Sequence, residues 1–271
     1  MLRLVAVPIL VAASAAAQYA PAVAEWNQPV EPFRIAGNMY YVGSSGLSSF
    51  LFTTPAGHIL LDTGFLETVP QIEANVKKLG FRVSDIRLLL ISHAHYDHTG
   101  GMAEMKAHTK ARLLASPADA ELLARGGHGD FAYGDKYPYP PVTVDGLLRD
   151  GETVRLGGTA LTAHFTPGHT KGNLSWTAKI AGYNVAISGG VTAPGYRLVG
   201  NTQYPEVLQD FENTFAKLRA MPCDICVSMH GWEFDLERKM RGKAPEAFID
   251  RAGWLAFIDR AQAAVRKQAA Q

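Results

Sequence analysis

The stretch from Ile91 to Met102, ISHAHYDHTGGM, places three histidines and one aspartate within six residues, directly after the apolar run IRLLLI. That run is short enough to be a buried strand. His93, His95, Asp97 and His98 stand at i, i+2, i+4 and i+5, a spacing that does not keep them on one face of a helix. It suits a loop that leaves the C-terminal end of a strand. Because imidazole and carboxylate groups are good ligands for Zn²⁺, the pattern predicts a metal site at a sheet edge.

Two further histidines follow predicted strands in the same way. His169 closes Thr166-Pro-Gly-His169 after the predicted strand 161–165, and His230 follows the predicted strand 223–229. A lone histidine after a strand is usually structural. Ligands that leave several strand ends at one edge are, however, how α/β folds assemble sites. With the dense cluster at 93–98 present, both His169 and His230 are predicted to be ligands.

Strand-like and helix-like segments alternate through most of the chain, which predicts a single mixed α/β domain over residues 25–271. Strands are predicted at 38–42, 49–53, 58–62, 86–91, 112–115, 161–165, 174–177, 184–187 and 223–229. Helices are predicted at 69–79, 101–108, 117–124, 204–220 and 246–267. Residues 126–141, GGHGDFAYGDKYPYPP, are predicted to form a long loop that either covers a substrate or is a plain surface excursion.

The first 24 residues have the shape of a secretory signal peptide. A short positive start leads into an apolar run, and small residues follow that fit cleavage after Ala17 or Ala24. This predicts export to the periplasm. The net charge of +1 gives no indication of a nucleic-acid partner, and no stretch after the signal is long and apolar enough to span a bilayer.

The two cysteines, Cys223 and Cys226, form a C-x-x-C spacing. Redox catalysis is disfavoured, because the motif runs into a predicted strand rather than starting a helix. A short disulfide would require a turn, since residues three apart on a strand face opposite ways. Either such a disulfide or two buried thiols fits the sequence.

The sequence resembles the metallo-β-lactamase superfamily from about Tyr40 to His230. The superfamily signature H-x-H-x-D-H stands here as HAHYDH at 93–98, and LLDTG at 60–64 and TPGHT at 166–170 match two further motifs. Within the superfamily it is most similar to subclass B3, on VTAPGY at 191–196, AMPCD at 220–224, the Gly-rich loop and the signal peptide.

The resemblance implies a four-layer αβ/βα sandwich with two zinc ions per chain at one edge. The first zinc would be held by His93, His95 and His169. The second would be held by Asp97, His98 and His230. Asp62 would lie beneath the ligands and orient one of them, unless it serves only as a turn-forming residue before Thr-Gly.

This family also implies a function, hydrolysis of the β-lactam amide by a zinc-bound hydroxide, which confers resistance to penicillins, cephalosporins and carbapenems. Asp97 or a water would supply the proton to the leaving nitrogen. Tyr196 would donate to the oxyanion, Thr192 would bind the substrate carboxylate, and Arg197 is a candidate for the same task on charge alone. Loop packing is the alternative for Thr192 and Tyr196.

One departure from subclass B3 bears on the second metal, because Gly190 stands where these enzymes commonly carry serine. Glyoxalase II-like thioesterases and acyl-homoserine lactonases carry an aspartate near this place, and Gly189-Gly190 offers no carboxylate. An exported lactone or ester hydrolase is the alternative enzyme, and a non-catalytic zinc-binding protein is the alternative of another class. The chain is expected to be a monomer that acts on a small molecule.

Overall fold

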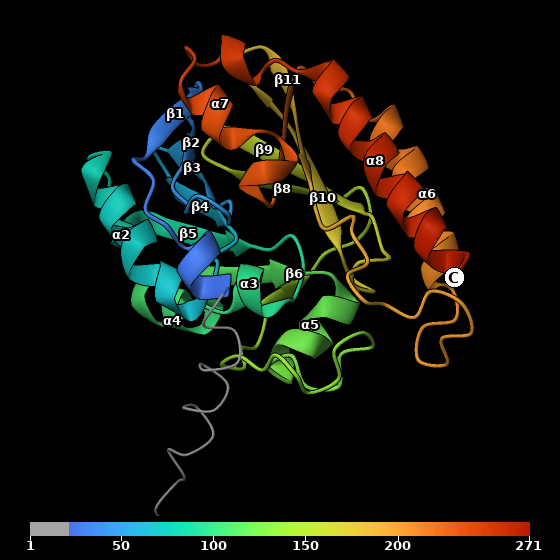
Figure 1. Cartoon of the computed structure of the whole chain (residues 1–271). Coiled ribbons are helices and arrows are strands. Elements are labelled where there is room, and N and C mark those ends of the chain that lie inside the picture. The colour runs from blue at the N-terminus through green and yellow to red at the C-terminus, as the bar shows by residue number, and fades with distance from the viewer. Residues whose placement is uncertain (1–21) are drawn as a thin grey trace, which may run out of the picture.

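The computed structural model describes residues 22–271, so the predicted signal peptide lies almost wholly outside the described residues. Two mixed β-sheets face each other (Figure 1). Strands β1 to β4 of the first sheet run antiparallel, and β4 to β7 run parallel. In spatial order this sheet holds β1 (Phe33–Ala36), β2 (Met39–Tyr41), β3 (Phe50–Thr54), β4 (Gly57–Leu61), β5 (Ile86–Leu90), β6 (Arg112–Ala115) and β7 (Gly146–Leu147).

The second sheet has five strands, and only its edge pair β12–β11 is parallel. In spatial order it holds β12 (Ile225–Ser228), β11 (Tyr183–Ser188), β10 (Leu174–Ile180), β9 (Thr159–Phe165) and β8 (Thr153–Leu156). Beyond a helical segment at residues 22–26, the α-helices are α2 (Val69–Lys78), α3 (Tyr96–Thr99), α4 (Met102–Thr109), α5 (Pro117–Ala124), α6 (Val207–Ala220), α7 (Leu236–Met240) and α8 (Arg251–Ala269). Short 3₁₀ turns lie at Leu66–Thr68, Val83–Asp85, Gly231–Glu233 and Glu246–Phe248.

Three apolar clusters separate four layers, which confirms the predicted αβ/βα sandwich. The first lies between the sheets and includes Trp176 and Phe50. The second packs the outer face of the first sheet against α2 and α4. The third packs the second sheet against α6 and α8, which Figure 1 shows on the opposite flank of the molecule. Within residues 22–271, no helix combines the length and apolar character that a bilayer span requires.

Strand ends from both sheets meet at one edge of the sandwich. The loop after β5 is joined to the second sheet, because Leu174 N donates to Ser92 O at 2.7 Å and Trp176 Nε1 donates to Ile91 O at 3.0 Å. His230, just beyond β12, is bridged to Leu47 in the first half of the chain. Side chains that follow β4, β5, β9 and β12 are therefore brought to a common place.

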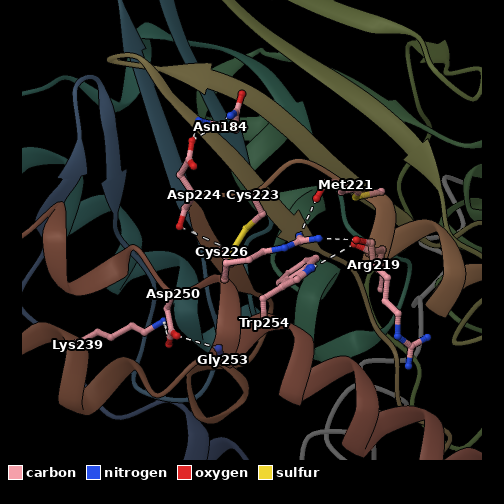
Figure 2. The surroundings of a disulfide bond; sticks show 12 residues. Asn184, Arg219, Met221, Cys223, Asp224, Cys226, Lys239, Asp250, Gly253 and Trp254 are labelled. Atoms are coloured by element: carbon pink, nitrogen blue, oxygen red, sulfur yellow. Dashed lines mark hydrogen bonds and ion pairs between the residues drawn. A yellow bond between two sulfur atoms is a disulfide. The ribbon is translucent and has the colours of Figure 1, made fainter.

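The C-terminal region differs from the prediction in two places. The single helix predicted over 246–267 is a 3₁₀ turn followed by α8, because Asp250 caps the helix by accepting a hydrogen bond from Gly253 N at 2.8 Å. The strand predicted from residue 223 begins only at Ile225. A turn before it closes a disulfide between Cys223 and Cys226, which Figure 2 shows beside Trp254.

Three strands were not predicted, and the metal-ligand segment contains a helix where a loop was expected. β1, β7 and β8 have two to four residues, too few to show a clear period in the sequence. Asp97 and His98 lie in α3, a single helical turn. That turn is what swings them back toward His93, as the spacing required.

Candidate metal centre

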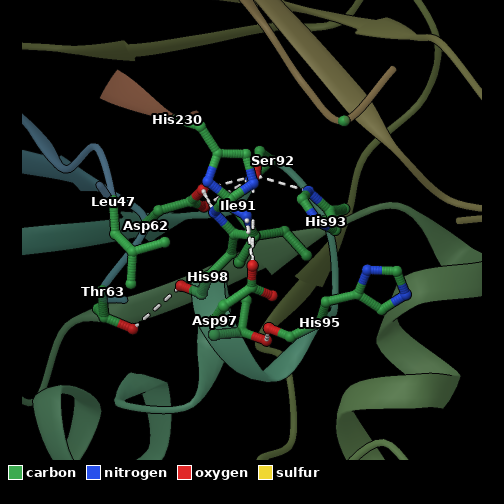
Figure 3. A network of polar contacts seen from close by, with 12 residues as sticks. Leu47, Asp62, Thr63, Ile91, Ser92, His93, His95, Asp97, His98 and His230 are labelled. Atoms are coloured by element: carbon green, nitrogen blue, oxygen red, sulfur yellow. Dashed lines mark hydrogen bonds and ion pairs between the residues drawn. The ribbon is translucent and has the colours of Figure 1, made fainter. Parts of the chain in front are cut away.

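Six side chains from three loops converge at the shared edge of the sheets. Ligand atoms of His93, His95 and His169 lie within 4.8 Å of one another, and so do those of His93, Asp97 and His98. His230 lies against the second group, with its Nε2 3.8 Å from Asp97 Oδ2. Figure 3 shows His98 and His230 gathered near the Asp97 carboxylate. All the predicted ligands are therefore brought together, across 137 positions of sequence from 93 to 230.

Each histidine of the first group has one ring nitrogen that lies close to an oxygen of the protein. His169 Nδ1 lies 2.6 Å from the carbonyl oxygen of Thr192, which only accepts, so Nδ1 carries the proton. His93 Nδ1 lies 3.0 Å from Ser92 Oγ. His95 Nε2 faces the Asp130 carboxylate at 3.6 Å. The opposite nitrogens are thereby turned to the centre, and His95 Nδ1 lies 3.1 Å from His169 Nε2.

The second group is oriented in the same manner. His230 Nδ1 donates to Gly46 O at 3.2 Å, which leaves Nε2 facing Asp97. His98 Nδ1 lies 3.4 Å from Asp62 Oδ2, and its Nε2 lies 3.3 Å from Asp97 Oδ2. Ligating histidines in metalloproteins are commonly fixed by a carbonyl or carboxylate at the second nitrogen. Carbonyl oxygens fix His169 and His230 in this way, and His95 and His98 each face a carboxylate, at 3.6 Å and 3.4 Å.

Buried nitrogens without a hydrogen-bond partner indicate that the centre fits a cation. His93 Nε2, His95 Nε2 and both ring nitrogens of His98 are buried and make no hydrogen bond within the described residues. An unsatisfied buried polar atom costs about 1–3 kcal/mol, so such atoms are rare without a ligand. Imidazole nitrogens with one carboxylate form a donor set suited to Zn²⁺.

The pKa values of the histidines in the centre differ, because burial dominates for His169 and His230 and nearby carboxylates dominate for His98. Burial lowers the pKa of His169 to about 3 and that of His230 to about 3, so both rings are neutral at pH 7, as ligation requires. Burial also acts on His98, but the carboxylates of Asp97 and Asp62 outweigh it and raise the pKa of His98 to about 10. A cation that binds His98 must therefore displace a proton.

A family model described as the metallo-β-lactamase superfamily matches residues 43–230, more than half of the chain. The chain belongs to the metallo-β-lactamase superfamily. Among solved structures, it is 46% identical to a Cronobacter sakazakii metallo-β-lactamase with the motif HARLDQ, with a TM-score of 0.89 over 92% of this chain and 98% of that one. It is 36% identical to BJP-1, a subclass B3 metallo-β-lactamase of Bradyrhizobium japonicum, with a TM-score of 0.86 over 92% and 97% of the two chains.

Matches to enzymes of other activities in the superfamily are partial. A hydroxyacylglutathione hydrolase of Methylobacterium nodulans is 35% identical over 101 residues, which is 37% of this chain. The match spans only 31% of that enzyme's length. This likeness covers a smaller share of both proteins than the likeness to the metallo-β-lactamase structures.

Asp62 lies directly under the superfamily signature, where the resemblance expected it. It is fully buried, and its two oxygens accept from Ser92 N at 2.7 Å and from Ser92 Oγ at 2.5 Å. Since the Ser92 hydroxyl proton goes to Asp62, Ser92 Oγ is free to accept from His93 Nδ1. Asp62 thus contacts His98 directly and orients His93 through Ser92.

The loop at 126–141 packs onto the centre and supplies a residue that the sequence analysis missed. Asp130 is 5% exposed and faces His95. The ring of Tyr133 lies 5.1 Å from that of His95, and Tyr137 stacks on Tyr96 at 4.5 Å. The sequence did contain a feature that could have identified Asp130, since it is an acidic residue within a long loop rich in aromatic residues. The loop forms a wall of the metal centre rather than a plain surface excursion.

The three predicted substrate contacts lie in different environments, and two of them, Thr192 and Tyr196, contact His169. Thr192 is exposed, and its backbone oxygen holds His169 Nδ1. Tyr196 is 4% exposed, and its hydroxyl donates to His169 O at 3.0 Å. Arg197 is exposed, and its Nε donates to Val199 O at 3.3 Å. Tyr196 therefore packs against the ligand loop with its hydroxyl already engaged.

Gly190, the departure from subclass B3, lies against the ring of His169. A Cβ at this position would come within 2.2 Å of His169 Cδ2 and 2.4 Å of its Cγ, closer than real Cβ contacts. The ring has little freedom to yield because Thr192 O holds its Nδ1. In this chain, the imidazole of His169 fills the space that a serine side chain at position 190 would need.

Gly190→Ala should therefore weaken metal binding. We expect at least about tenfold lower affinity for one zinc equivalent, because a ligand displaced by several tenths of an ångström no longer fits its cation. Zinc content after dialysis against a chelator measures the effect. Gly182→Ala is the control, since no atom lies near that position and its φ of 91° predicts backbone strain alone. Unchanged zinc affinity in Gly190→Ala would contradict the expectation.

Proposed function

We propose that this chain is an exported zinc-dependent β-lactamase of the B3 type, which hydrolyses the amide bond of β-lactams and so confers resistance to them. One observation carries the proposal. Five imidazoles, each with one nitrogen beside an oxygen of the protein, turn their other nitrogen toward a centre that also contains the Asp97 carboxylate. The chain matches B3 structures over about nine-tenths of its length.

The two donor groups would hold two zinc ions, the first on His93, His95 and His169 and the second on Asp97, His98 and His230. Bound zinc would supply hydroxide at neutral pH and polarise the substrate carbonyl. Three histidine ligands with a fourth position left for solvent are typical of a catalytic zinc.

The chain's own residues would orient the substrate and move the proton. Asp97 lies between His98 and His230, where its carboxylate could pass a proton to the departing nitrogen. Thr192 and Arg197 would bind the substrate carboxylate at the rim. Tyr196 would donate to the oxyanion, for which its hydroxyl must leave the carbonyl of His169.

The comparison with the Cronobacter sakazakii enzyme supports a full ligand set in this chain. That enzyme is named for the motif HARLDQ, and this chain has HAHYDH at 93–98. In register, the arginine and glutamine of that motif stand where this chain has His95 and His98. The chain therefore carries an imidazole at both positions, which favours binding of two cations.

Export to the periplasm is part of the proposal. Its support is the signal-like sequence of residues 1–24 and the disulfide between Cys223 and Cys226, a bond that forms and persists in oxidising compartments. Residues 25–271 would then act as one domain, as a monomer with no nucleic-acid or membrane partner.

The test is a hydrolysis panel on protein purified without its first 24 residues. With two equivalents of Zn²⁺, it should hydrolyse nitrocefin and a carbapenem. A chelator should lower the rate by at least about 100-fold, because the hydroxide is lost, and added zinc should restore it. Absorbance at the wavelength of the opened β-lactam measures the rate.

Two other results would replace this function by another. Turnover of homoserine lactones or simple esters alone would identify a lactonase or esterase of the same superfamily. Bound zinc without hydrolysis of any amide, ester or lactone would identify a zinc-binding protein, which would need a closed coordination sphere.

A further inference from the structure

Asp119 is a buried carboxylate behind the metal centre that has no part in the chemistry described above. It lies in the first turn of α5 and is 1% exposed. A buried carboxylate is costly unless several hydrogen bonds compensate it. Asp119 has three acceptor contacts, and they come from two loops that meet only in the folded protein.

Those contacts join the two loops that carry the first ligand group. Asp119 Oδ2 accepts from Ala94 N at 2.8 Å, and Ala94 stands between two of the ligands. The same oxygen accepts from Thr170 Oγ1 at 2.9 Å, next to His169. Asp119 Oδ1 accepts from Gly172 N at 3.0 Å. One carboxylate thus sets the distance between the 93–95 loop and the 169–172 loop.

The N-terminus of α5 reinforces this link. Ser116 caps the helix through Asp119 N and donates from its Oγ to Gly172 O at 2.6 Å. The N–H and the carbonyl oxygen of Gly172 are therefore both hydrogen-bonded to side chains at the N-terminus of α5. Within residues 22–271, none of the side-chain hydrogen bonds of Asp119 reaches Asp97, His98 or the loop of His230.

We propose that Asp119 is a positioning residue for the first cation site alone, held by His93, His95 and His169. By fixing the two loops relative to each other, it keeps the three imidazoles at the spacing a cation needs. The inference depends on the metal part of the proposed function. Asp62 differs from it, because Asp62 contacts His98 directly and His93 through Ser92, and so serves both groups.

The variant Asp119→Asn tests this site selectivity. Its amide replaces one acceptor oxygen by a donor, which must face a backbone N–H at Ala94 or Gly172. The variant is made in two backgrounds, His230→Ala, which spares the first group, and His169→Ala, which disables it. We expect Asp119→Asn to weaken zinc binding about tenfold or more in the first background and less than twofold in the second.

The measurement is competition for Zn²⁺ with a chromophoric chelator, together with the visible spectrum of the Co²⁺-loaded protein. The melting temperature of the metal-free protein is recorded in parallel, because a purely structural role would lower it without changing zinc affinity. Asp259→Asn is the matched control, since Asp259 is an exposed aspartate paired with Arg219 on another helix. It should leave zinc affinity unchanged.

A second pair of variants keeps the test decisive if Asp119→Asn fails to fold. Thr170→Val removes one donor with little change of shape and should weaken the first site, whereas Thr170→Ser keeps the hydroxyl and should restore it. Equal losses in both backgrounds, or lower thermal stability with unchanged zinc affinity, would overturn the inference. Parent protein that binds no zinc would instead contradict the proposed function.

Discussion

His93→Ala should lower kcat/KM for nitrocefin by about 10³-fold or more, the largest effect expected of a single substitution. His93 belongs to the first donor group and also lies within 4.8 Å of ligand atoms of Asp97 and His98, and its Nε2 is buried and without a hydrogen-bond partner. Removing His93 leaves the first donor group with two ligands and creates an empty space between the first and second donor groups. The measurement is steady-state kinetics with zinc in excess, with zinc content determined on the same sample.

His128→Ala is the matched control for this substitution. His128 lies in the loop at 126–141, its side chain is 51% exposed, and it pairs with Asp135 on the surface. Its loss should change kcat/KM by less than about twofold, since an exposed pair contributes little. Activity of His93→Ala within tenfold of the parent would mean that the centre does not perform the reaction.

Trp176→Ala should lower the free energy of unfolding by about 3–5 kcal/mol, the largest effect expected on stability. Trp176 lies in β10, is fully buried, and belongs to the cluster between the two sheets. Its Nε1 donates to Ile91 O, two residues before His93. Its loss should therefore leave a cavity between the sheets and loosen the ligand loop. Urea denaturation followed by circular dichroism measures the change.

Trp176→Phe separates packing from the hydrogen bond. It retains much of the buried area and loses the Nε1 donor, so the free energy of unfolding should fall less, by about 1–3 kcal/mol for an unsatisfied carbonyl. Leu147→Ala, at a side chain that is 57% exposed, should have almost no effect. Comparable losses for Trp176→Ala and Leu147→Ala would show that the cluster between the sheets does not depend on Trp176.

Much of the architecture could be predicted because the order of apolar and polar residues within each segment indicates its secondary structure. The mostly apolar run of β5 and the amphipathic period of α6 marked buried elements without reference to the rest of the chain. The boundaries at residues 223–250 were less predictable. There, the disulfide and the Asp250 cap decide where β12 and α8 begin, and both need partners that only the folded chain brings into place.

The sequence by itself determined which donors this protein has and that they follow strand ends, since residue type and spacing around 93–98, 169 and 230 need no partner to be recognised. Only the tertiary structure decided how those donors are oriented. The oxygens that face them, such as Asp130 for His95 and Gly46 for His230, lie far away in sequence and have no motif of their own. A hydrogen bond acts over about 3 Å, so its partners are chosen by packing of the two sheets and not by distance along the chain.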